Sequence, residues 1–254
     1  MPKESGTGLA DLSHSGPAPK ARVAVIVPAY NEAGRIRRVL RVVRQVEVLD
    51  EILVVDDGST DATLDQIPRG DGIRTISLGR NHGKGGAMQT GVAHTQADII
   101  LFLDADLVGR TPSQVEDLVV PLLRDEADMA IGLFRAGRAW TDLGQRLVPY
   151  ISGQRAVRRS FFLDLPDLGT TRAGVEVALT YHAKRQGLRV CHVPLTGVTH
   201  VMKEEKLGLW RGSRARLRMY WEITRYVLSQ SARARARSFY LRLNGKLPAS
   251  GNGG

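Results

Sequence analysis

Short apolar runs alternate with segments of helical periodicity along the first half of the chain. Each run is brief, rich in branched residues and followed by polar or glycine positions, which is typical of buried parallel strands. The runs cover 23–27, 52–55, 73–78 and 99–103, and two later strand-like runs cover 129–134 and 190–193. We therefore expect an α/β fold in which a mostly parallel, Rossmann-like sheet is flanked by helices.

Helices are predicted between these strands. The first has Asn31 as its expected cap and four apolar residues at the spacing of one helical face, namely Ile36, Val39, Leu40 and Val43. Others are predicted after Thr60, after Gly86 and from Pro112. In such a β-α-β arrangement the loops after the strands gather on one edge of the sheet, where open parallel sheets bind ligands.

The most informative polar residues follow the run at 99–103. Asp104 and Asp106 stand on either side of Ala105, at the predicted mouth of a buried strand. Carboxylates are hard oxygen ligands that suit Mg²⁺ or Mn²⁺, and phosphate oxygens would complete the shell of such an ion. The motif therefore predicts a divalent cation that binds a diphosphate, although acidic pairs also occur in turns and as solvated loop charge.

Polar segments follow the other three strands as well. They are Pro28-Ala29-Tyr30-Asn31-Glu32, Asp56-Asp57-Gly58-Ser59 and Arg80-Asn81-His82-Gly83-Lys84-Gly85-Gly86. Each has a plain structural alternative as a strand exit, a helix cap or a turn. Their succession at strand ends favours one shared ligand site.

Length and composition indicate one domain. The chain has 254 residues, 43% of them hydrophobic, which is enough to bury a sizeable core. We predict disordered tails at 1–20 and 244–254, the domain at 21–205 and a basic helical extension at 206–243. No run approaches the roughly 20 apolar residues that span a bilayer, and the single Cys191 supports no disulfide framework. A cytoplasmic location is therefore expected.

The predicted extension is basic and amphipathic. The formal net charge of the chain is +10, and arginines are concentrated after residue 205. Trp210, Leu217 and Trp221 fall on roughly one helical face, as in a helix that lies on a membrane surface. Nucleic acid is an alternative partner, but none of the strand-end motifs is typical of base recognition. Packing of the same face on the sheet is the third alternative.

Together, the strand-end motifs resemble those of family-2 glycosyltransferases with the GT-A fold. The segments that carry the resemblance are 25–32, 54–61, 81–85 and 103–106. They are most similar to the branch that contains dolichyl-phosphate mannose synthase and other polyprenyl-phosphate sugar transferases. The match is looser in the second half of the chain, where the acceptor is recognised in that branch.

The resemblance implies a nucleotide-sugar pocket. It places Asp57 at the base or ribose, because a carboxylate accepts hydrogen bonds from a ring N–H or a hydroxyl. It places Lys84 beside the donor diphosphate, a cation on glycine-rich backbone that phosphate can approach closely; a solvated charge at a helix start is the alternative. The other implied contacts with the donor are Pro28, Ala29, Tyr30, Glu32 and Ala105.

The resemblance also implies a metal centre for Mg²⁺ or Mn²⁺. Asp106 would be the principal ligand, Asp104 a metal or ribose contact, and His200 a further ligand, with a structural histidine as the alternative. The ion would act as a Lewis acid on the leaving nucleoside diphosphate. Val108 stands where dolichyl-phosphate mannose synthases commonly carry glutamine, which leaves the donor sugar open.

Residues of the second half are candidates for the acceptor. A phosphate acceptor is already an anion near neutral pH, so it needs cationic positioning more than a general base. Arg135 and Arg155 match positions that the related enzymes associate with acceptor phosphate, which the arginine fork binds bidentately. Glu176 resembles an acidic position that supplies a base or sugar contact in inverting relatives, and a structural ion pair is its alternative.

The sequence therefore predicts a metal-dependent hexosyltransferase with Asp104, Asp106 and Glu176 as catalytic residues. The expected donor is a UDP- or GDP-sugar, the expected acceptor is polyprenyl or dolichyl phosphate or another phosphorylated compound, and the expected outcome is inversion. We expect the protein to be peripheral on the inner face of the membrane. Two alternatives stay open: a soluble-acceptor enzyme resembling glucosyl-3-phosphoglycerate synthase, and a non-catalytic nucleotide-sugar-binding or membrane-scaffold protein.

Overall fold

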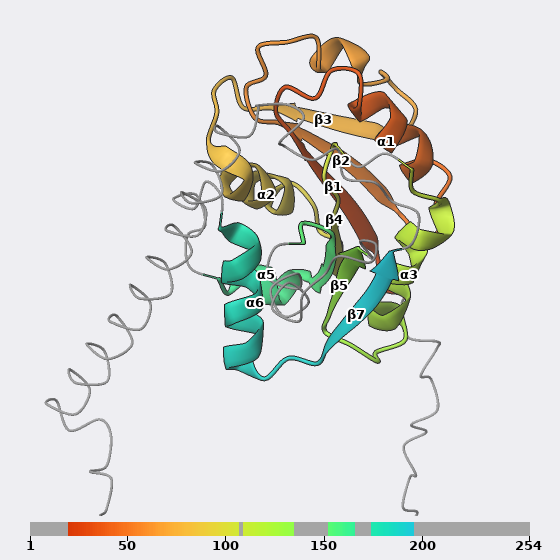
Figure 1. Ribbon diagram of the computed structural model, residues 1–254, viewed down its shortest axis with the longest axis vertical. Coiled ribbons are helices and arrows are strands. Elements are labelled where there is room, and N and C mark those ends of the chain that lie inside the picture. Colours follow the sequence, from red (N-terminus) through yellow and green to blue (C-terminus); the bar gives the residue numbers. More distant parts are fainter. Residues whose placement is uncertain (1–19, 107–108, 135–151, 166–173, 196–254) are drawn as a thin grey trace, which may run out of the picture.

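A seven-stranded sheet with the order β3-β2-β1-β4-β6-β5-β7 forms the centre of the computed structural model, which describes residues 20–106, 109–134, 152–165 and 174–195 (Figure 1). Neighbouring strands are parallel except β6, which runs antiparallel to β4 and β5. The strands are β1 Val23–Ala29, β2 Glu51–Asp56, β3 Ile73–Ser77, β4 Ile99–Phe102, β5 Met129–Phe134, β6 Arg155–Arg158 and β7 Val190–Leu195. The predicted α/β class and all six predicted strands are confirmed.

Helices cover both faces of the sheet (Figure 1). The helices are α1 Ile36–Val43, α2 Gly83–Ala93, α3 Pro112–Leu123, α5 Arg159–Leu163 and α6 Val175–Gln186, with a short 3-10 turn, η1, at Leu64–Gln66. One buried cluster joins α1 and α3 to residues such as Val25 and Val27, and the other joins α2, α5 and α6 to residues such as Ala24 and Ile26. Alternate side chains of each strand therefore supply the two core layers.

Two predictions about helix starts are wrong. Asn31 does not cap α1: it has a positive φ of 55°, and its side chain accepts a hydrogen bond from Thr60 N at 2.8 Å. That bond ties the exit of β1 to the exit of β2, and α1 begins after the intervening turn. The helix expected after Thr60 is only the short η1.

The other two helices agree better with the sequence. The helix α2 begins at Gly83, four residues before the predicted start after Gly86. The segment α3 begins at Pro112 as predicted, and Thr111 caps it by accepting a hydrogen bond from Gln114 N.

The strand β6 was not predicted. Its Ala156 and Val157 are buried between β4 and β5, but arginines flank them, so the segment resembles a basic loop in the sequence. It brings residues 152–154 beside the end of β4. None of the described helices is long and apolar enough to cross a bilayer. Apart from Lys20, the predicted tails and the extension at 206–243 lie outside the described residues.

Candidate active site

Asp104 lies one residue beyond the last core position of the central strand β4. Leu103 is buried and donates its N–H to the carbonyl of Ile26 at 3.1 Å, which continues the sheet to the motif. The N–H of Asp104 donates to Oε1 of Gln154 at 3.3 Å. The backbone that carries the first acidic residue is therefore held from the side of β1 and from the segment before β6.

Three charged side chains meet at this point, and we call Lys84, Asp104 and Glu176 the ion-pair triad. The Nζ of Lys84, from the first turn of α2, donates to Oδ1 of Asp104 and, at 2.6 Å, to Oε1 of Glu176 in the first turn of α6. The side chains are 27%, 19% and 14% exposed. Burial would lower the pKa of Lys84, but the two carboxylates outweigh it and raise the pKa above its ordinary value. Lys84 is thus a permanent cation here.

Gly153 makes room for the triad. A Cβ at this position would lie 2.5 Å from Nζ of Lys84 and 2.6 Å from Oδ1 of Asp104. Only a residue without a side chain lets the backbone approach the ion pair this closely. The resemblance related the nearby Arg155 to acceptor phosphate and gave no indication that Gly153 supports Asp104. The glycine and glutamine that precede Arg155 were the available signal.

Asp57 is buried at the end of β2 and organises the start of α2. Its two carboxylate oxygens accept hydrogen bonds from the N–H groups of His82 at 2.7 Å and Gly83 at 2.8 Å. Burial raises the pKa of Asp57, although these backbone donors oppose the rise. The neighbouring Gly58 has a φ of +72° and lies against the backbone of Arg80. The predicted contact of Asp57 with a base or ribose stays a prediction, and its observed partners position Lys84.

The end of β1 supplies the remaining predicted donor contacts. Ala29 is buried, whereas the side chain of Tyr30 is exposed at the strand exit. Glu32 forms an ion pair with Arg35 at 2.5 Å, and Pro28 lies within β1. Tyr30 therefore has a free aromatic surface on the same edge as the triad, and the nucleotide contacts of all four residues stay predictions.

The acidic motif offers a place for a divalent cation. In the part of the chain that the structure describes, no hydrogen bond or ion pair engages the carboxylate of Asp106. Ala105 is buried between the two acidic residues. The described residues contain no group of three or more metal-binding side chains. The predicted third ligand, His200, lies outside them, as do Val108 and Arg135. Two carboxylates, one of them unengaged, fit a hard cation that takes its other ligands from phosphate or water.

Arg155 occupies a structural position. Its side chain is fully buried, its Nε and Nη2 donate to the carbonyl of Ser152 at 3.2 and 2.5 Å, and its Nη1 donates to the carbonyl of Glu176 at 3.0 Å. Burial lowers its pKa to about 10, against the attraction of Glu176 and Asp104. The side chain joins β6 to α6 and so positions Glu176. Because all three guanidinium nitrogens already donate to protein oxygens, this arrangement argues against the predicted contact with an acceptor phosphate.

These residues lie at the carboxyl ends of parallel strands, which is the edge where open α/β sheets bind ligands. A family model described as glycosyl transferase family 2 matches residues 24–180. Among curated relatives, undecaprenyl-phosphate 4-deoxy-4-formamido-L-arabinose transferase of Salmonella choleraesuis (strain SC-B67) is 33% identical over 130 residues, which are 48% of this chain and 39% of the relative. The chain thus spans well under half the length of the curated relatives that it matches.

Solved structures of glucosyl-3-phosphoglycerate synthase from Mycobacterium tuberculosis are similar over a larger share. The complex with Mn²⁺ and UDP-glucose is 29% identical with a TM-score of 0.64, over 80% of this chain and 79% of that chain. The complex with Mn²⁺, UDP and phosphoglyceric acid is 30% identical with a TM-score of 0.62, over 71% and 70%.

Proposed function

Because the chain belongs to glycosyl transferase family 2 and has the GT-A fold, we propose that it transfers a hexose from a nucleoside-diphosphate sugar to a polyprenyl phosphate. The observation that carries the proposal is the ion-pair triad beside the carboxylate of Asp106, which no other residue in the described part of the chain engages. Together they combine one cation with three carboxylates at one sheet edge. These are the groups that a diphosphate and its counterion require.

Asp104 and Asp106 would hold Mg²⁺ or Mn²⁺, with His200 as a third ligand. The ion, when bound, supplies Lewis-acid neutralisation of charge on the departing diphosphate. Lys84 adds a positive charge that does not depend on pH near neutrality, since the carboxylates of Asp104 and Glu176 keep it protonated. Tyr30 provides an aromatic surface for the base, and Asp57 holds the backbone from which Lys84 projects.

The ion pair of Glu176 bears on which kind of acceptor the site suits. Its carboxylate is paired with Lys84 at 2.6 Å, so it is a weak candidate for a general base. A phosphate acceptor needs no base because it is already an anion. An acceptor that carries phosphate is therefore the better fit, and the undecaprenyl-phosphate enzyme among the relatives supports a lipid carrier. We place the reaction at the inner face of the membrane.

A direct transfer assay tests the proposal. Full-length protein is incubated with Mn²⁺, undecaprenyl phosphate in detergent and one radiolabelled UDP- or GDP-hexose at a time, and the organic phase is counted. We expect a lipid-linked product from at least one donor and none from the Asp106→Asn variant. Absence of a lipid-linked product with every donor contradicts the proposal.

Transfer to phosphoglycerate is the second candidate, and the solved structures of glucosyl-3-phosphoglycerate synthase favour it. In this version of the assay 3-phosphoglycerate is the acceptor, and the radiolabelled product is separated by anion exchange instead of extraction into the organic phase. A product there, with no lipid-linked product, would select the soluble acceptor. The anomeric configuration of either product, read by NMR, then tests the expected inversion.

A further inference from the structure

The guanidinium of Arg110 is buried and has no hydrogen-bond partner among the described residues. The residue is only 7% exposed, yet its Nε, Nη1 and Nη2 make no hydrogen bond within the described part of the chain. It lies two residues before α3 and lines a cavity of about 10 Å³ with Leu103, Val115 and residues of α1. That volume holds roughly one water molecule, so the cavity is not the ligand site. The unusual feature is the uncompensated charge.

The cation persists despite its burial. Burial lowers the pKa of Arg110 to about 10, and the negative charge of Asp104 opposes this fall, so the side chain remains protonated at neutral pH. Arg155, which is also buried, donates its guanidinium N–H groups to protein carbonyls. A buried charge without such partners is costly, and an anion that reaches Arg110 would compensate it with strong, charge-assisted hydrogen bonds.

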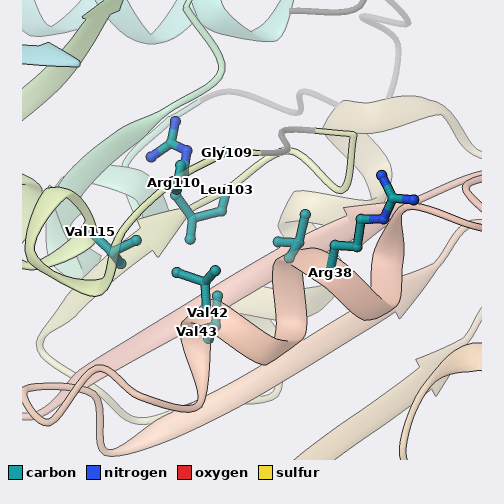
Figure 2. A pocket seen from close by; sticks show the side chains of 8 residues that line it. Arg38, Val42, Val43, Leu103, Gly109, Arg110 and Val115 are labelled. Carbon is teal, nitrogen blue, oxygen red and sulfur yellow. The ribbon is translucent and has the colours of Figure 1, made fainter. Parts of the chain in front are cut away.

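Lys84 and Arg110 lie on opposite sides of β4. Lys84 comes from α2, which packs on the core layer that contains Ile26, whereas Arg110 adjoins Leu103 and Val115 in the layer of α1 and α3. Figure 2 shows the guanidinium of Arg110 directed away from the apolar side chains of Val42 and Val43, with Arg38 at the far end of the group. Asp104 is therefore paired with Lys84 on one side. On the other side it attracts Arg110, which has no hydrogen-bond partner in the part of the chain that the structure describes.

We propose that Arg110 binds the phosphate of the acceptor, the role that the sequence assigned to Arg155. The inference rests on the proposed function and names one residue of its acceptor site. In the proposed function, Lys84 and the ion at Asp104 and Asp106 bind the donor diphosphate. The acceptor phosphate is then the anion that remains for Arg110 to bind. The planar fork of arginine suits a phosphate dianion.

The first test measures stability without ligand. Arg110→Met removes the unpaired charge and keeps an apolar side chain of similar length, so we expect the melting temperature of the full chain to equal or exceed that of the wild type. A clear fall in melting temperature would contradict the proposal, because it would reveal an internal partner for Arg110. Arg38→Met is the matched control, since Arg38 lines the same cavity but is exposed.

The second test measures phosphate binding. With saturating UDP and Mn²⁺, inorganic phosphate is titrated against the full chain at constant ionic strength, and the Kd is taken from the shift in melting temperature. We expect Arg110→Met to weaken phosphate binding about 10- to 100-fold and to leave the Kd for UDP with Mn²⁺ unchanged, with Arg38→Met like the wild type. Arg110→Lys, which keeps the charge and loses the fork, should weaken phosphate binding by a smaller factor.

Three results would overturn the assignment. They are wild-type protein that does not bind phosphate, an Arg110→Met protein that binds it normally, and one that loses UDP in the same proportion, which would make Arg110 a donor contact. None of these measurements requires sugar transfer. A chain that binds both phosphate and UDP but transfers no sugar would therefore contradict the proposed function and leave the assignment of Arg110 intact. Replacing inorganic phosphate by undecaprenyl phosphate or 3-phosphoglycerate then distinguishes a lipid source from a soluble one.

Discussion

At the scale of single residues, Gly153 determines whether the ion-pair triad can form. Because a Cβ there would lie 2.5 Å from Nζ of Lys84, we expect Gly153→Ala to push Lys84 away from Asp104. Displacing a group at the reacting centre should lower kcat on the order of 100-fold, and overpacking should cost about 1–3 kcal/mol of unfolding free energy. Assay of transfer and urea unfolding check both effects.

The matched control for this change is Gly174→Ala. Gly174 is also buried and precedes α6, but a Cβ there would meet nothing within 4 Å and its φ is −130°. We expect nearly wild-type kcat and stability. If both alanine variants behaved alike, the close approach of Gly153 to the triad would have no functional meaning.

A substitution at Asp106 can distinguish an effect on metal binding from an effect on folding stability. Its carboxylate has no partner among the described residues, so Asp106→Asn should change the free energy of unfolding by less than about 0.5 kcal/mol. It should also remove the additional rise in melting temperature that Mn²⁺ gives to the UDP complex. Asp104→Asn, which breaks the pair with Lys84, should lose stability as well. A variant at Asp106 that still responds to Mn²⁺ like the wild type would exclude this residue as the principal ligand.

At the scale of elements, the ends of β5, β6 and β7 are held together by Asp128. Its carboxylate accepts hydrogen bonds from Arg189 N at 3.0 Å, Arg189 Nη2 at 2.9 Å and Arg158 Nε at 3.4 Å. The hydrogen bonds from Arg189 are the largest cause that lowers the pKa of Asp128 below its ordinary value of 3.8. This network fixes where the parallel pair of β5 and β7 begins.

The lowered pKa gives a pH dependence with a definite sign. A depressed carboxyl pKa adds stability above pH 3.8, the unfolded value, and that stability is lost as the pH falls through the lower folded value. Because Arg189 is about half exposed, we expect Asp128→Asn to cost only about 1 kcal/mol at pH 7. The difference from the wild type should shrink below pH 3.8. Urea unfolding at several pH values measures it, with the exposed Asp164→Asn as the control.

The elements that the sequence predicted are those whose signal is local. Apolar runs give the strands because burial on both faces selects short branched stretches, and the polar residues after them converge because parallel strands end at one edge. Asn31 was misread because its partner, Thr60, lies 29 residues away. Likewise, the pairing of Lys84 with Glu176 joins positions 92 apart. The fold buries Arg155, for which the resemblance implied a contact with acceptor phosphate, and Arg110, which no sequence motif singled out.

At the scale of the whole molecule, both faces of the sheet contribute charged side chains to the edge where Asp104 lies. The face with α2 and α6 supplies Lys84 and Glu176, and the face with α1 and α3 supplies Arg110 (Figures 1 and 2). The strand β6, antiparallel between β4 and β5, carries the segment that contacts Asp104 from the side. The central position of β4 explains why its acidic residues can be reached from several elements at once.

The net charge of +10 predicts that the chain binds anionic membrane surfaces. Anionic lipid attracts each nearby Lys or Arg by about 1 kcal/mol, and salt screens this attraction. We expect the full chain to float with vesicles containing phosphatidylglycerol at low salt, to bind neutral phosphatidylcholine vesicles weakly, and to be released by about 0.5 M NaCl as the Debye length shortens. Undecaprenyl phosphate in the vesicles should strengthen the binding. RNA that displaced the protein from vesicles at stoichiometric amounts would favour nucleic acid as the partner instead, because a basic surface alone does not distinguish the two polyanions.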